Sequence, residues 1–170
     1  MTRTRTRQGS GSSPQVQGTD EAGRIDPSPQ RGEARMVNVH TIDAVLEVVV
    51  GAGASNGGVA IDTWHMAKLG IAPDELRRIP VGALAWVELS DGQVENMADP
   101  VDEVINHRAL PGEGEFDIRG YVDACRDHGY DGPWGVEVLS EELRNNPMDV
   151  IFRRAYDTTI AQFEHERSAA

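Results

Sequence analysis

Acidic side chains stand near the end of three apolar segments of this chain. The segments are GVAIDTWH at 58–65, ALAWVELSDG at 83–92 and PWGVEVLS at 133–140. Each has the length and composition of a buried strand, and their late polar positions are Asp62, His65, Glu88, Asp91 and Glu137. Carboxylate oxygens and imidazole nitrogens bind divalent metal ions, and they also act as acids and bases. We therefore expect metal-assisted or acid–base chemistry where these strands end.

Glu88 and Glu137 carry most of this expectation because each interrupts an otherwise apolar run. The strands of a parallel sheet are buried on both faces, and an isolated buried carboxylate is costly unless it is paired or bound to a metal. One cation shared by Glu88 and Glu137 explains both positions with a single cause. Pairing of either glutamate with an arginine of a neighbouring element is the alternative.

Two interpretations are open for the pair Asp62 and His65, and two for Arg108. Asp62 and His65 lie three residues apart, so both can face one ligand, but Asp62 can equally cap the turn that follows it. Arg108 precedes the rigid turn PGEG, where a guanidinium can hold a phosphate, a carboxylate or a sugar hydroxyl. A solvated loop arginine is the alternative for Arg108.

The elements that must position these side chains alternate between strand and helix patterns, in the order α-β-α-β-loop-α-β-α. This alternation is typical of an α/β protein with a parallel sheet. In such folds the active groups gather at the carboxyl ends of the strands. We therefore expect Asp62, His65, Glu88, Asp91 and Glu137 to converge on one rim of the sheet.

Helix signals lie between and after the three strand segments. Thr41 is a predicted N-cap and the glycines at 51 and 53 a predicted stop for the first helix, a short helix is expected within 71–80, and Asp117 and Gly129 bound a third helix. A polar loop of some twenty residues is expected before residue 109. The last helix opens near Pro147, and its expected buried face is Phe152, Tyr156, Ile160 and Phe163.

Composition limits the class of protein. The 170 residues are 39% hydrophobic, which suffices for one domain with a core, and we place this domain at 36–166 after a disordered low-complexity tail at 1–35. A formal charge of −12 argues against nucleic-acid binding, and no segment has the roughly 20 apolar residues of a membrane span. We expect a soluble cytoplasmic protein, in which the single cysteine, Cys125, is a small core residue.

Four motifs in this order resemble the sugar phosphate isomerase/epimerase family, the xylose isomerase-like TIM barrels. They are GVAIDTWH, VELSDG, HRALPGEGEFD and GVEVLS with the helix after it, and the resemblance covers roughly residues 41–165. The resemblance implies a TIM barrel of which this chain holds only the last three strands with their helices, since a complete barrel needs about 250 residues. The first half of the family's barrel has no counterpart in the ordered part of the chain.

The family's chemistry implies specific roles for these residues. The resemblance implies that Asp62, Glu88 and Glu137 bind a divalent metal ion (Mn²⁺, Mg²⁺ or Co²⁺), where Glu88 replaces the family's usual His or Gln. Glu137 would also be a catalytic acid or base, and His65 and Arg108 would bind the substrate. The implied reaction is a metal-dependent isomerisation or epimerisation by proton transfer, on a sugar or polyol-derived small molecule.

Three alternatives accompany this expectation. The missing first half predicts a truncated or misannotated gene product, and open strand edges predict a homo-oligomer or a complementing chain. Dehydration, as in inosose or dehydroshikimate dehydratases, is the alternative metal-dependent reaction. A non-catalytic half barrel kept as an interaction module is the alternative outside enzymology.

Overall fold

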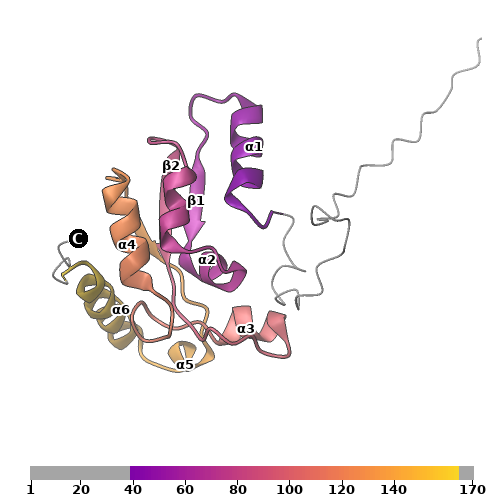
Figure 1. Cartoon of the computed structure of the whole chain (residues 1–170). Coiled ribbons are helices and arrows are strands. Elements are labelled where there is room, and N and C mark those ends of the chain that lie inside the picture. Colours follow the sequence, from indigo (N-terminus) through magenta and orange to yellow (C-terminus); the bar gives the residue numbers. More distant parts are fainter. Residues whose placement is uncertain (1–38, 165–170) are drawn as a thin grey trace, which may run out of the picture. The chain divides into compact units, whose positions relative to one another are not determined.

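The computed structural model describes residues 39–164, and the tail expected at 1–35 lies outside them. The helices and strands lie in the order shown in Figure 1. The strands are β1 (Val59–Asp62), β2 (Leu84–Leu89) and β3 (Trp134–Val136); the helices are α1 (Ile42–Ala52), α2 (Thr63–Leu69), the 3₁₀ helix η2 (Pro73–Arg78), α3 (Pro100–Asn106), α4 (Ile118–Asp127), α5 (Glu141–Arg144) and α6 (Met148–Phe163).

The three strands form one parallel sheet in the order β1-β2-β3, which confirms the expected α/β architecture. Asp62 of β1 pairs with Glu88 of β2, and Glu88 pairs with Gly135 of β3. Paired residues of parallel strands direct their side chains to the same face. The sheet register therefore sets Asp62 and Glu88 side by side at the carboxyl ends of their strands.

The core lies on the opposite face of the sheet, where apolar strand residues meet the helices. Val87 and Leu89 of β2 are fully buried there, together with Val122 and Cys125 of α4. Burial raises the pKa of the Cys125 thiol to about 12, as expected for a core residue. Figure 1 shows α1 beside β1 and α6 beside α4.

The capping signals in the sequence correspond to real helix ends. The Thr41 hydroxyl accepts a hydrogen bond from the Ala44 amide at 3.2 Å, and Gly53 ends α1 in the left-handed conformation at φ 59°. The Asp117 carboxylate caps α4 through the Gly120 amide at 2.9 Å. Local sequence was sufficient here because a cap depends only on residues within one helical turn.

The polar loop expected before residue 109 contains a helix, so that expectation was wrong. Asp99 caps α3, and Pro100 occupies its first turn. The helix is held by a buried ion pair between Lys68 of α2 and Glu103 of α3. The pair Asp99-Pro100 is a signal for the start of a helix. The apolar pattern did not predict α3 because its buried face contains Glu103, whose partner Lys68 lies 35 residues away.

The expected burial of α6 is also wrong in part. Phe152 and Tyr156 are each 66% exposed, whereas Phe163 packs edge-on against Trp134 with ring centroids 5.0 Å apart. The reason is that β3 is an edge strand: among the described residues, no further element lies beyond it to cover the first half of α6. Within residues 39–164, no helix combines the length and apolarity that a membrane span requires.

Candidate metal centre at the strand ends

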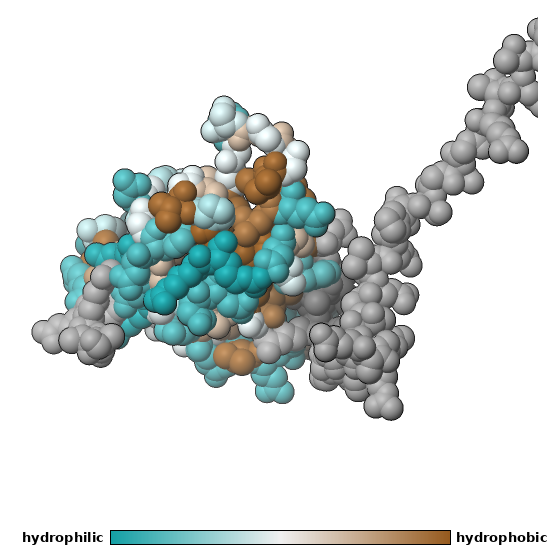
Figure 2. Space-filling view, turned by 45° about the horizontal axis from the view of Figure 1, so that its top comes forward, coloured by the Kyte–Doolittle hydropathy of each residue, from teal (hydrophilic) through white to brown (hydrophobic). Residues whose placement is uncertain are grey.

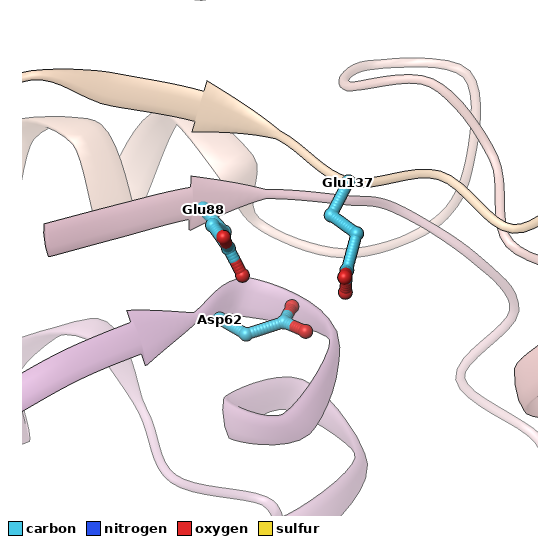
Figure 3. A group of neighbouring side chains, drawn as sticks. All are labelled: Asp62, Glu88 and Glu137. Carbon is cyan, nitrogen blue, oxygen red and sulfur yellow. The ribbon is translucent and has the colours of Figure 1, made fainter.

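Three carboxylates converge at the carboxyl edge of the sheet. Asp62, Glu88 and Glu137 each offer one oxygen, and these oxygens all lie within 4.8 Å of one another. Figure 3 shows the three side chains extending from neighbouring strand ends toward one common space. The sequence expectation that these acids would meet at one rim therefore agrees with the geometry, although they are 75 residues apart along the chain at the extremes.

Asp62 serves two purposes with its two oxygens. Its Oδ1 accepts a hydrogen bond from the Trp64 amide at 2.8 Å and so caps α2. Its Oδ2 lies 3.0 Å from Arg108 Nη1 and 3.4 Å from His65 Nε2. The capping interpretation of Asp62 is thus confirmed, and its second oxygen still faces the cluster, because a carboxylate has acceptor sites on two separate oxygens.

Glu88 is held in place by its neighbours on the sheet. Trp86 Nε1 donates a hydrogen bond to Glu88 Oε1 at 2.8 Å. Gly135 of β3 lies opposite Glu88 in the sheet. A Cβ added at Gly135 would come within 2.8 Å of the Trp86 ring and 3.3 Å of Glu88 Cγ. The glycine therefore leaves the space in which the Trp86 and Glu88 side chains lie.

Glu137 is more exposed than the sequence predicts. It follows the last residue of β3, its side chain is 50% exposed, and its Oε2 accepts a hydrogen bond from Arg108 Nη1 at 3.1 Å. A strand buried on both faces was the wrong assumption, because β3 is an edge strand and Glu137 lies just beyond its last residue. The alternative of an arginine partner is thus realised for Glu137.

Arg108 lies between two of the three carboxylates and is not a solvated loop residue. Its side chain is 3% exposed, and its guanidinium carbon lies 5.2 Å from the centre of the buried Trp64 ring. Its backbone amide donates to Leu139 O at 3.1 Å, and isolated bridges pin the residues on either side of it. The guanidinium is therefore presented to the carboxylates by a fixed backbone.

His65 lies at the margin of the cluster. It belongs to the first turn of α2, a helix that the sequence analysis did not predict, and its side chain is 40% exposed. Together with Asp62 it borders a mostly apolar pocket of about 160 Å³ between α1, β1 and α2. An imidazole in this position can reach a molecule bound beside Asp62.

Asp91 does not join the cluster, so its expected place among the converging acids is wrong. Its side chain is fully buried and turned into the PGEG turn, where it accepts hydrogen bonds from the amides of Gly92, Gly112 and Phe116 at 2.7, 2.9 and 3.0 Å. An added Cβ at Gly114 would overlap the Asp91 carboxylate and the Gly92 backbone. Asp91 therefore shapes the loop that follows Arg108.

The far side of the same turn is held by Arg154, which sequence reasoning missed. Its Nε and Nη2 make a two-point contact with Glu113 at 2.7 and 2.8 Å, and its Nη1 donates to Glu142 at 2.7 Å. These contacts raise the pKa of the Arg154 guanidinium above its usual value. No local signal could identify this clamp, since Arg154 and Glu113 are 41 residues apart.

The residues present fit a hard divalent cation. The three side chains of the cluster supply only oxygen donors, which Mg²⁺ and Mn²⁺ prefer. Three carboxylates and the Arg108 guanidinium leave a formal charge of −2, which one divalent ion would balance.

Comparison with known proteins shows a matching family model and several similar proteins. A family model described as xylose isomerase-like TIM barrel matches residues 30–157. The 3-dehydroshikimate dehydratase of Pseudomonas putida is 29% identical over 110 residues, which cover 65% of this chain and 17% of the relative. The inosose isomerase of Halalkalibacterium halodurans is 23% identical over 122 residues, which cover 72% of this chain and 42% of that protein.

Among solved structures, one described as the IOLI protein with a binding zinc atom has the same fold. It superposes with a TM-score of 0.65 at 21% identity, over 73% of this chain and 44% of that one. The chain thus spans less than half the length of each of these similar proteins. A three-stranded parallel sheet with its helices corresponds to part of such a barrel.

Proposed function

Because this chain belongs to the xylose isomerase-like TIM barrel family, we propose that Asp62, Glu88 and Glu137 bind a divalent metal ion and support proton transfer on a sugar or polyol-derived substrate. The observation that carries this proposal is the convergence of the three carboxylate oxygens to within 4.8 Å at the strand ends. An isomerase or epimerase is the enzyme class that this arrangement favours. The oxygen donors favour Mg²⁺ or Mn²⁺, with Co²⁺ as a further candidate.

The protein side chains would divide the work as follows. Glu137 is the proposed acid or base, because its half-exposed carboxylate is open to a carbon-bound proton of the substrate. Arg108 and His65 are the proposed substrate contacts, since both adjoin Asp62 Oδ2 and can donate to hydroxyl or anionic oxygens. A bound metal ion would supply Lewis-acid polarisation of a substrate carbonyl or hydroxyl.

Calorimetric titration of the purified full chain with Mn²⁺, Mg²⁺ and Co²⁺ tests this proposal. We expect saturable binding by the unaltered chain and loss of binding in Asp62→Ala and Glu137→Ala. Glu47→Ala, which removes an exposed acid from α1, serves as the control for lowering the overall negative charge. Equal uptake by all four proteins, or none by any of them, would refute the metal centre.

Dehydration is the second candidate reaction, and the similarity to 3-dehydroshikimate dehydratase favours it. It would use the same metal and the same Glu137 carboxylate, but the proton removed would be followed by loss of a hydroxyl as water. Mass analysis of the product separates the two reactions, since isomerisation leaves the substrate mass unchanged and dehydration lowers it by one water.

A non-catalytic interaction module is the third candidate, and exposed apolar surface supports it. Trp86 of β2, Val136 of β3, and Phe152 and Tyr156 of α6 are exposed. Figure 2 shows apolar residues gathered among hydrophilic ones on one face of the molecule. A second copy or a complementing chain would be the partner. Light scattering of the purified chain across a dilution series measures the oligomeric state directly.

A further inference from the structure

Arg108 contacts the same carboxylates that the proposed metal ion would use. One guanidinium nitrogen, Nη1, is 3.0 Å from Asp62 Oδ2 and 3.1 Å from Glu137 Oε2. We propose that Arg108 is the internal counter-ion of this cluster and that it competes with the divalent metal ion for Asp62 and Glu137. This inference rests on the function proposed above, because it assigns a regulator to the same site.

The burial of Arg108 and Asp62 makes the competition strong at Asp62, whereas Glu137 is half-exposed. The Arg108 side chain is 3% exposed and that of Asp62 is 11% exposed, so water screens their charges little. A divalent ion at the same carboxylates would be repelled by a guanidinium a few ångströms away. Binding of the metal ion therefore requires the guanidinium to withdraw, or costs the repulsion between the two cations.

The backbone of Arg108 is held by contacts that are separate from those of its side chain. The Arg108 amide is bonded to Leu139 O, and the bridges Asp91–Ala109 and His107–Ser140 hold the chain on either side. The guanidinium itself is held by the two carboxylates and the face of Trp64, and no described residue accepts a hydrogen bond from its Nε. Loss of the ion pairs would therefore release the side chain alone.

A functional consequence follows for the order of binding. A guanidinium displaced from Asp62 and Glu137 is available to the anionic or hydroxyl oxygens of a substrate. The metal ion would then bind first and prepare Arg108 for the substrate.

The test compares Mn²⁺ affinity by calorimetry for the full chain and three arginine variants. We expect Arg108→Gln to tighten Mn²⁺ binding about tenfold, equivalent to about 1.4 kcal/mol. Arg108→Lys keeps the charge and should stay within about threefold of the unaltered chain. The control is Arg78→Gln, because Arg78 also joins two carboxylates, Asp43 and Glu75, but lies outside the cluster.

Each outcome decides a separate point. Unchanged or weaker binding in Arg108→Gln overturns the competition while leaving the metal centre intact, and equal tightening in Arg108→Lys shows that bulk, not charge, is responsible. Absence of binding in every protein refutes the metal centre itself. If circular dichroism shows that Arg108→Gln does not fold, the NMR signal of the Arg108 Nε–H group in the unaltered chain replaces it as the test. This signal is assigned by its loss in Arg108→Lys, and we expect it to shift when Mg²⁺ is added. A signal that does not shift overturns the inference.

Discussion

Asp62 and Glu88 stand directly opposite each other on the neighbouring parallel strands β1 and β2. Their side chains leave the sheet on the same face, and the Glu137 carboxylate reaches the same space from the end of β3. The register of the sheet, not a local motif, therefore assembles the acidic cluster.

Replacement of Glu88 by histidine should change the metal preference of the centre. A ring nitrogen in place of a carboxylate oxygen favours Zn²⁺ over Mn²⁺. We expect Glu88→His to raise the ratio of Zn²⁺ to Mn²⁺ affinity by about tenfold in competition calorimetry, whereas Glu47→His on α1 leaves it unchanged. A ratio that does not move would show that Glu88 is not a ligand.

Two substitutions of Asp62 should separate its two oxygens by function. Serine retains an N-cap for α2 and alanine does not, so Asp62→Ala should be less stable than Asp62→Ser by about 1 kcal/mol. Both remove the carboxylate that faces Arg108, so both should lose Mn²⁺ binding. Urea denaturation and calorimetry measure the two effects, and retained binding in Asp62→Ser would contradict the assignment.

Gly114→Ala should disturb the turn that follows Arg108. Its added Cβ would overlap the Asp91 carboxylate and the Gly92 backbone, and neither group can move aside without distorting the turn. We expect a loss of about 1–3 kcal/mol in the free energy of unfolding. Gly51→Ala is the matched control, because nothing lies within 4 Å of its Cβ and alanine favours the α1 helix. Equal effects of both changes would argue against the close approach at Gly114.

Removing one partner of the buried Lys68–Glu103 pair should destabilise the fold strongly, whereas replacing both with apolar residues should destabilise it little. Lys68→Met leaves an uncompensated buried carboxylate, which typically costs about 3–5 kcal/mol of folding free energy. The double variant Lys68→Met with Glu103→Leu should recover most of that loss, because it removes both charges. Urea denaturation of the two variants measures the difference, and a double variant as unstable as the single one would contradict this account.

Cys125 should resist thiol reagents in the folded protein. Burial raises its pKa to about 12, so the folded thiol keeps its proton where the unfolded thiol, at about 8.5, has lost it. The Cys125 contribution to stability is therefore complete below about pH 8.5 and declines as the pH rises toward 12. Alkylation at pH 9 should be slow in the native protein and fast in urea; rapid native labelling would contradict the burial.

Much of the framework could be predicted from local sequence. The strand ends at Asp62 and Leu89, the cap at Thr41 and the buried Cys125 all depend on residues within one turn or one strand. The α3 helix was not predicted because a glutamate such as Glu103 normally indicates an exposed position, and its burial depends on the distant partner Lys68. The exposed face of α6 was missed because helical periodicity states which residues are apolar, not whether anything covers them.

By itself, the sequence determined that acids would stand at the ends of parallel strands, because strand length and apolar patterning are local properties. Only the tertiary structure decided which of those acids meet. It turned Asp91 into the PGEG turn and brought Arg108 between Asp62 and Glu137, 46 and 29 residues away along the chain. The direction of a side chain beyond a strand end depends on how the following loop folds and packs, and that packing joins residues whose separation leaves no local signal.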